Sequence, residues 1–263
     1  MEEIVKGIDA FQEAFSPYSN AFIVIGGSAC RAVLQDGIVR PRRTKDIDMV
    51  LAVQELNHDF IGRFWKFIQD GGYKFASRKN KVGDVRYVFY SFVGGKEGFP
   101  EQIELLSRPD DSIGAPSDHH IAYIETDDDY SHLSAIILDR DYYEYLSNHY
   151  QVVDGIRYAS ADALICLKAL AYVNLLQEKQ FGKHVNEDDI KKHRRDVLLA
   201  VSSLPVDARF EVNPGIREML NAFLDSISDT ITRQSLKASL GIDDSSLDGL
   251  LEILRGSFIT TEA

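Results

Sequence analysis

The segment Asp46-Ile47-Asp48 places two carboxylates two positions apart within a run of apolar residues. In a β-strand, residues two apart point to the same face, so Asp46 and Asp48 project together while Ile47 points away. Adjacent carboxylates repel each other, which calls for a cation between them or a raised pKa in one of them. Oxygen ligands of this kind suit Mg²⁺, which proteins hold through one or two carboxylates together with substrate phosphates. Taken alone, the pair is equally well interpreted as two solvated acids at an exposed strand end.

A second group, Gly26-Gly27-Ser28, directly follows the short apolar run 21–25. A buried strand that ends in two glycines and opens a helix predicts a tight turn at which the backbone approaches a ligand closely. The free N–H groups at the start of such a helix favour phosphate, and Ser28 adds a hydroxyl, so these three residues are candidate nucleotide ligands. The segment is neither a Walker A loop, which requires Gly-Lys-Ser/Thr, nor a dinucleotide fingerprint.

Residues 24–28 (VIGGS) and 43–50 (RTKDIDMV) together resemble the two-part signature of the DNA polymerase beta-like nucleotidyltransferase superfamily. Within it, the chain is most similar to the abortive-infection toxin nucleotidyltransferases of the AbiEii/AbiGii type. The resemblance covers about residues 20–200. The connecting segment 29–45 is longer than in many members, and we place the extra residues near 35–37, where they would change access to the site and leave its geometry intact.

The resemblance implies Mg²⁺-dependent transfer of a nucleoside monophosphate from a nucleoside triphosphate (NTP), with release of pyrophosphate. Asp46 and Asp48 would hold the metal, with two ions expected, and a third carboxylate from a neighbouring strand would complete the site. Glu104 matches that position best, while Asp84 and Glu101 are rivals. The alternative for Glu104 is an ordinary surface glutamate on an edge strand.

Further catalytic and nucleotide contacts are expected from basic residues on both sides of the carboxylates. Arg43 and Lys45 belong to a basic loop that suits a small polyanion. Lys168 matches a lysine on a helix of the family, and its apolar neighbours require an anionic partner or a ligand phosphate, unless it extends to solvent from a helix edge. Lys192 and Asp196 match a later segment that departs from the family at the residue after Lys192. An i,i+4 ion pair explains their spacing nearly as well.

Hydrophobic periodicity predicts the elements that must position these residues. After about residue 140 the strand signals fade, and beyond a hairpin at Asp154-Gly155 only helices are expected. We expect an α/β (α+β) fold in which a nucleotidyltransferase-type mixed sheet with flanking helices occupies residues 1–150. A helical domain over 151–263 would close the nucleotide cleft. The expected strands are 21–25, 46–53, 84–92, 102–106, 120–125 and 133–138, and the expected helices are 3–15, 28–34, 60–68, 160–175, 186–201, 214–226 and 245–256.

Composition narrows the classes of protein to consider. The formal net charge is -12, from 29 basic and 41 acidic residues, which argues against a protein that grips nucleic acid over a broad face. No apolar run reaches the roughly 18 residues that span a bilayer, and the first residues lack the basic region of a signal peptide. We therefore expect a cytoplasmic protein without membrane contacts. Cys30 and Cys166 lie in apolar stretches and are expected to be buried thiols.

The acceptor of the nucleotidyl group stays open between transfer RNA, a protein hydroxyl and a small molecule such as an aminoglycoside. The resemblance also implies a role in a toxin or defence system and a cognate antitoxin as a partner. Two other functions stay open from the sequence. One is a catalytically silent binding protein of the same fold in a toxin–antitoxin complex, and the other is a metal-dependent phosphohydrolase that releases phosphate in place of pyrophosphate.

Overall fold

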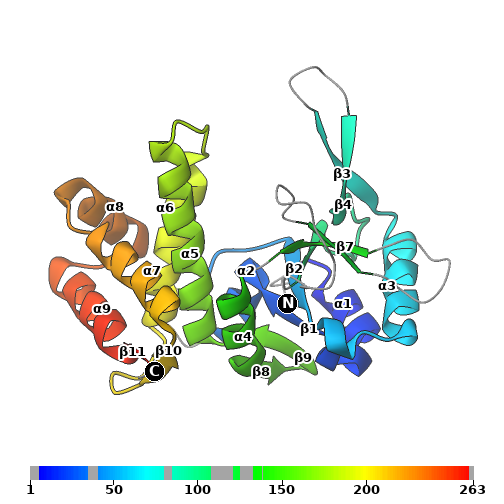
Figure 1. The fold of residues 1–263 in the computed structure, drawn as a ribbon, viewed down its shortest axis with the longest axis horizontal. Coiled ribbons are helices and arrows are strands. Elements are labelled where there is room, and N and C mark those ends of the chain that lie inside the picture. Colours follow the sequence, from blue (N-terminus) through cyan, green and yellow to red (C-terminus); the bar gives the residue numbers. More distant parts are fainter. Residues whose placement is uncertain are drawn as a thin grey trace. The chain divides into compact units, whose positions relative to one another are not determined.

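The structure is a computed structural model that describes residues 6–34, 41–79, 85–107, 121–124, 133–137 and 139–260 (Figure 1). It divides into two compact units. The first comprises Met1–Ala32 with Arg42–Ala159, and the second comprises Val33–Pro41 with Ser160–Ala263. Each unit is described by itself below.

A mixed β-sheet forms the centre of the first unit, which confirms the expected α/β class. Its strands follow the order β3-β4-β5-β2-β1-β9-β8, with β7 beside β5 and β6 beside β7. β2 is parallel to β5 and antiparallel to β1, while β9 is parallel to β1. The strands are β1 (Phe22–Ile25), β2 (Asp46–Leu51), β3 (Lys74–Lys79), β4 (Val85–Val93), β5 (Gln102–Ser107), β6 (Ile121–Ile124), β7 (Leu133–Ile137), β8 (Tyr150–Val153) and β9 (Ile156–Ala159).

An aromatic cluster covers one face of this sheet. The ring of Phe15 in α1 lies 6.0 Å from Phe22 of β1 and 6.2 Å from Phe64 of α3, and Phe64 lies 5.3 Å from Phe92 of β4. All four rings are almost fully buried, so the cluster supplies much of the apolar burial of this unit. The helical segments of the unit, with two 3-10 turns, are α1 (Ile8–Phe15), η1 (Ser16–Ala21), α2 (Gly26–Val33), η2 (Val53–Glu55), α3 (His58–Gly71) and α4 (Arg140–Asn148).

Local sequence signals explain why α3 begins and ends where it does. The Asn57 side chain caps its first turn by accepting a hydrogen bond of 2.9 Å from the Phe60 N–H. Gly72 ends the helix with a left-handed backbone (φ +71), the conformation that glycine adopts most easily. Between these two signals, apolar residues recur at helical spacing and face the sheet.

Besides the 3-10 turns η1 and η2, two elements of the first unit are additional to those expected from the sequence. The strand β3 (Lys74–Lys79) is rich in charged residues, and it exists because β4 offers it a ladder of hydrogen bonds. The helix α4 (Arg140–Asn148) is capped by Asp139, whose carboxylate accepts from the Asp141 N–H. The hairpin β8–β9 belongs to the sheet, since Tyr158 of β9 pairs with β1, and the change of unit therefore falls after Ala159.

The second unit is mainly helical, and Figure 1 shows its long helices α5 and α6 running alongside each other. The sequence indicated no strand here, but β10 and β11 form a small parallel sheet, and the helix α8 was also missed. Strands of three residues are too short for an alternating pattern to reveal them. The elements are α5 (Ala161–Gln180), α6 (Glu187–Val201), β10 (Phe210–Val212), α7 (Pro214–Asp225), α8 (Thr230–Leu240), α9 (Asp244–Ser257) and β11 (Phe258–Thr260).

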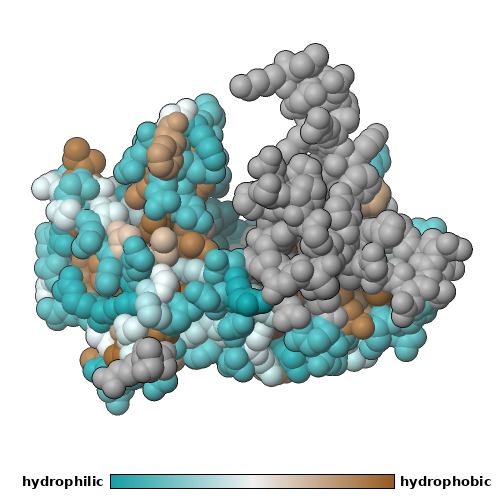
Figure 2. Space-filling view, in the orientation of Figure 1, coloured by the Kyte–Doolittle hydropathy of each residue, from teal (hydrophilic) through white to brown (hydrophobic). Residues whose placement is uncertain are grey.

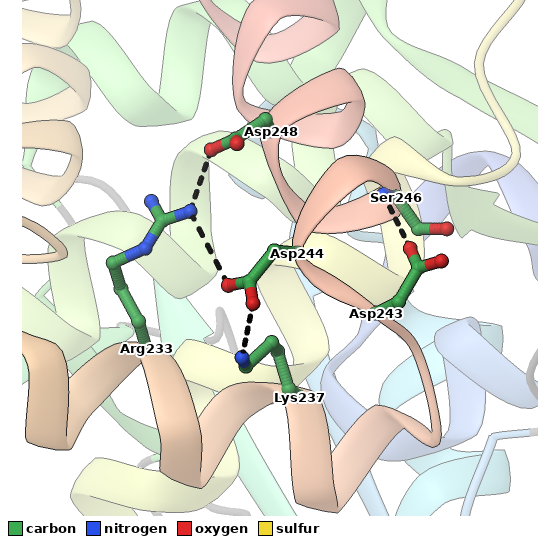
Figure 3. Close-up of polar contacts among 6 residues, drawn as sticks. All are labelled: Arg233, Lys237, Asp243, Asp244, Ser246 and Asp248. Carbon is green, nitrogen blue, oxygen red and sulfur yellow. Dashed lines mark hydrogen bonds and ion pairs between the residues drawn. The ribbon is translucent and has the colours of Figure 1, made fainter.

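Ion pairs link α8 to α9 near the chain end (Figure 3). Arg233 donates to Asp248 at 2.6 Å, and Lys237 donates to Asp244 at 2.6 Å. The carboxylate of Asp243 accepts from the Ser246 N–H and so caps α9, and Asp229 caps α8 in the same way. These hydrogen bonds lower the pKa of both capping carboxyls.

The face of the second unit seen in Figure 2 is predominantly hydrophilic, with apolar residues scattered over it. Phe181, Val206 and Ile231 are the most exposed of the large apolar side chains that the structure describes. Scattered exposed apolar residues are normal on a folded protein. Over the described ranges, none of the helices has the length and the apolar character needed to cross a membrane.

Candidate active site

The carboxylates predicted from the sequence lie on one face of β2 and β5. The two strands are parallel and in register, with Asp48 opposite Glu104 and Asp46 opposite Gln102. Residues that are paired across neighbouring strands point to the same side of a sheet, so Asp46, Asp48 and Glu104 share a face. The alternate residues Ile47 and Met49 are fully buried on the other side, toward the aromatic cluster. The burial of the apolar face thus holds the acids on the opposite one.

The glycine turn lies directly beside this row of acids. Ile25, the last residue of β1, is paired with Asp48, and Gly26 follows with a left-handed backbone (φ +73). A Cβ atom on Gly26 would lie 2.1 Å from Oδ2 of Asp48. At Gly27 a Cβ atom would lie 3.1 Å from the hydroxyl of Thr44. Backbone conformation and space therefore both demand glycine at position 26, and the turn brings the main chain against the Asp48 carboxylate.

Ser28 has a hydrogen-bond partner in the fold that its position in the sequence did not predict. Its side chain is buried, and its hydroxyl donates a hydrogen bond of 2.5 Å to the backbone carbonyl of Asp46. This bond ties the first turn of α2 to the first residue of β2. Ser28 therefore helps to hold the backbone of Asp46 in place. Its hydroxyl has one proton, and this hydrogen bond takes it.

Glu104 is held by two neighbours on the same face. The hydroxyl of Ser91 in β4 donates to its Oε1 at 3.1 Å, and the Gln102 amide donates to the same oxygen at 2.7 Å. Ser91 is paired with Glu104 in the antiparallel β4–β5 ladder. Glu104 thus lies between Asp48 on one side and Ser91 on the other. Ser91 and Gln102 were not singled out in the sequence, where nothing showed that β4 would lie beside β5.

The two rivals for the third carboxylate have different positions. Glu101 forms an ion pair of 3.1 Å with Lys45, and both side chains are about half exposed. The hydrogen bond from the Lys45 ammonium, together with its charge, lowers the pKa of Glu101. Asp84 lies outside the described residues. Arg43 is exposed just before β2, so this loop offers positive charge at the surface.

The donor set on this face consists of carboxylate oxygens, which suit a hard cation such as Mg²⁺. In the part of the chain that the structure describes, no three acidic, histidine or cysteine side chains converge as a ready metal site. Mg²⁺ is normally held by one or two carboxylates together with substrate phosphates and water, and it does not need a complete protein cage. Asp46, Asp48 and Glu104 supply oxygen donors of this type on one face of the sheet.

Lys168 and Asp196, which the sequence suggested for separate roles, form a buried ion pair within the second unit. Nζ of Lys168 in α5 lies 3.5 Å from Oδ2 of Asp196 in α6, and the two side chains are 8% and 5% exposed. Arg195 approaches the other carboxylate oxygen at 3.9 Å. Lys168 thus has the anionic partner that its burial requires, which is a protein carboxylate. Lys192, four residues before Asp196, is partly exposed on α6.

Ser160 at the start of α5 and the two cysteines have local environments that favour structural roles. Ser160 stands at the N-cap position, but its hydroxyl donates to the Asp162 carboxylate at 2.6 Å. Cys30 and Cys166 are buried free thiols, as expected. Burial first, and then the negative charge of Asp162, raises the pKa of the Cys166 thiol well above its usual value. A thiol in this environment stays protonated and is a poor nucleophile or metal ligand.

Comparison with known proteins leaves the interpretation of the site to its own residues. Searches against family models, curated proteins and solved structures found no match to this chain.

Proposed function

We propose that this protein is a Mg²⁺-dependent nucleotidyltransferase, which moves a nucleoside monophosphate from a triphosphate to an acceptor hydroxyl. The observation that carries the proposal is the in-register pairing of β2 with β5, because it puts Asp46, Asp48 and Glu104 on one face of the sheet. A turn that requires glycine at Gly26 lies against the same carboxylates. Metal-assisted phosphate chemistry uses hard oxygen ligands for the cation. It also needs a backbone segment without side chains, which the phosphates can approach closely.

Each residue of the face has a distinct part in this proposal. Asp46 and Asp48 hold the cation, and Ser28 keeps Asp46 in register through the hydrogen bond to its carbonyl. Bound Mg²⁺ would neutralise charge on the triphosphate and polarise the phosphoryl group under attack. Glu104 would complete the ligand set and help to activate the acceptor hydroxyl, whose proton passes to water. The backbone at Gly26 and Gly27 lets the triphosphate lie close to the sheet.

Basic residues would contribute through charge. Lys45 is held by Glu101, so a triphosphate would compete with that carboxylate for the ammonium group. Arg43 is exposed just before β2 and can contact phosphates, while Lys192 stays a candidate through the sequence resemblance alone. The pairing of Lys168 with Asp196 explains the burial of Lys168 without a ligand phosphate, so the proposal does not depend on it.

The acceptor is proposed as a hydroxyl-bearing molecule, with transfer RNA, a protein and a small molecule as the three classes to compare. A cognate antitoxin remains part of the proposal through the sequence resemblance. The comparison is made by incubating the protein with each α-labelled triphosphate, Mg²⁺ and fractionated cell extract. The fraction that takes up label identifies the acceptor class, and release of pyrophosphate in place of phosphate distinguishes the transferase from a phosphohydrolase.

The decisive test compares wild type with Asp48→Asn by thermal unfolding. A ligand that binds only the folded protein stabilises it by RT ln(1 + [L]/Kd), which is about 2.7 kcal/mol at 100 times Kd. Wild-type Tm should therefore rise with Mg²⁺ and triphosphate together more than with either alone. Asp48→Asn removes one ligand and one repulsive charge, so its apo Tm should be no lower, while the ligand-induced rise and the transfer activity should both be lost.

The matched control is Glu211→Gln, which neutralises an exposed strand carboxylate on β10 of the second unit. This variant should keep the wild-type rise in Tm and the wild-type activity. An Asp48→Asn protein that keeps both properties would show that the carboxylate pair is not the metal site. A wild-type protein that binds the triphosphate but labels no fraction would favour the silent binding protein.

A further inference from the structure

Three side chains from β4 and β5 form a closed set of hydrogen bonds around one oxygen of Glu104. The Gln102 amide donates to Oε1 of Glu104 at 2.7 Å and to the hydroxyl oxygen of Ser91 at 3.2 Å. The Ser91 hydroxyl donates its own proton to the same Oε1 at 3.1 Å. Gln102 and Ser91 therefore fix each other's orientation as well as that of the carboxylate.

The bonds are unevenly distributed over the carboxylate. Within the described part of the chain, the hydrogen bonds that Glu104 accepts fall on Oε1, which leaves Oε2 for another ligand. Ser91 is 3% exposed, so its hydroxyl is shielded from competing water. On the side away from Ser91, the neighbour of Glu104 in the sheet is Asp48. A carboxylate held by one oxygen beside a second carboxylate is arranged to offer its other oxygen to a shared cation.

We propose that Ser91 and Gln102 are positioning residues of the metal site, which hold Oε1 of Glu104 so that Oε2 coordinates the cation shared with Asp48. This inference rests on the proposed function, because it assumes that the acidic face binds a divalent cation. Hydrogen bonds from neighbouring groups orient the carboxylates that ligate metals, and loss of such a bond typically weakens metal binding 10–100-fold. Neither residue touches the cation, so their effect passes through Glu104.

The test measures binding of Mn²⁺ alone to the full chain, with free Mn²⁺ followed by electron paramagnetic resonance. Ser91→Ala and Gln102→Leu should each weaken Mn²⁺ binding by roughly 10–100-fold. The double variant should be little worse than the stronger single one, because both donors act on one oxygen. Ser91→Thr keeps the hydroxyl and should retain most of the affinity, which a purely steric role for Ser91 would not predict.

Matched controls separate loss of a bond from loss of a polar group. Ser107→Ala removes another buried hydroxyl from β5, and Gln151→Leu removes an exposed amide from β8, and both should bind Mn²⁺ as wild type does. Gln102→Met keeps a side chain of similar length and removes the donor without adding a charge, so it should also lose affinity. Circular dichroism melts without metal establish that each variant is folded.

The outcomes distinguish this inference from the proposed function. If Glu104→Gln loses Mn²⁺ binding while Ser91→Ala, Gln102→Leu and Gln102→Met keep wild-type affinity, the positioning role is wrong and the metal site stands. If wild type itself shows no saturable Mn²⁺ binding, or if Glu104→Gln binds as wild type does, the assignment of Glu104 as a ligand is overturned and the positioning role falls with it.

Discussion

Replacement of Lys168 by methionine removes one member of the buried ion pair between α5 and α6. At 3.5 Å between Nζ and Oδ2, two unit charges in an effective dielectric of about 20 attract by about 5 kcal/mol. The cost of desolvating both charges offsets much of this attraction in the intact pair. The single replacement, however, leaves Asp196 buried without its main partner, which typically costs about 3–5 kcal/mol. Because Arg195 lies 3.9 Å from the other oxygen, we expect a loss near the lower end, about 3 kcal/mol.

Urea unfolding followed by far-ultraviolet circular dichroism measures this loss through the shift of the transition midpoint. The series comprises Lys168→Met, Asp196→Leu and the double variant. Since apolar side chains of similar volume can replace a buried ion pair at little cost, the double variant should lie within about 1 kcal/mol of wild type. Strong coupling between the two positions is therefore the expected signature.

An exposed pair provides the control. Lys179 and Glu187 also join α5 to the start of α6, at the shorter distance of 2.6 Å, but their side chains are 53% and 56% exposed. Lys179→Met should cost less than about 1 kcal/mol, because solvent screens the pair. If Lys168→Met costs no more than this control, or if the losses at Lys168 and Asp196 simply add, burial does not strengthen the pair. Lys168 would then again be a candidate for binding a ligand phosphate.

Three further predictions concern the site and the helix caps. Gly26→Ala should lower the stability by about 1–2 kcal/mol, the usual cost of a left-handed backbone for a residue with a Cβ atom. It should also weaken Mn²⁺ binding in a metal titration. Unchanged stability and binding would show that the turn tolerates a side chain. Ser28→Ala should destabilise the protein by roughly 1–2 kcal/mol in urea unfolding, since the carbonyl of Asp46 loses its buried donor. A variant with wild-type stability that has lost triphosphate affinity would instead make Ser28 a direct phosphate ligand. Asp229 and Asp243 have pKa values lowered from 3.8 by the hydrogen bonds they accept, so their stabilising contribution is present above about pH 4 and is lost as the pH falls through the lower folded-state values. Asparagine also caps helices well, so the double Asp→Asn variant should keep its stability at neutral pH. As the pH falls below about 4, it should lose less stability than wild type, measured by Tm against pH. Parallel curves for the two proteins would contradict this assignment.

The sequence alone determined the elements that carry a strong local signal. The helix α3 has an asparagine cap, apolar residues at helical spacing and a terminal glycine. The first four residues of β2 alternate between acids and buried apolar residues. Such signals depend on side chains a few positions apart and on backbone preferences, which the linear sequence contains. The identity of Asp46 and Asp48 as a pair on one strand face follows from the same rule.

Local patterns were insufficient wherever an element depends on a partner distant in the sequence. The charged strand β3 exists through its pairing with β4, and the short strands β10 and β11 exist through each other. The hairpin β8–β9 has a clear turn signal, but its membership of the first unit follows from the pairing of β9 with β1. A strand's pairing partner depends on which edges come together, and the hydrophobic pattern of one strand does not specify this.

The tertiary structure alone decided the partners of the functional side chains. Ser28 resembled a phosphate ligand in the sequence, but in the fold its hydroxyl reaches the carbonyl of Asp46. Lys168 and Asp196 meet because α5 packs against α6. A buried polar group must satisfy its hydrogen bonds or its charge within the fold. The sequence could therefore show that Lys168 needs a partner, but only the packing of strands and helices determined which partner each of these side chains has.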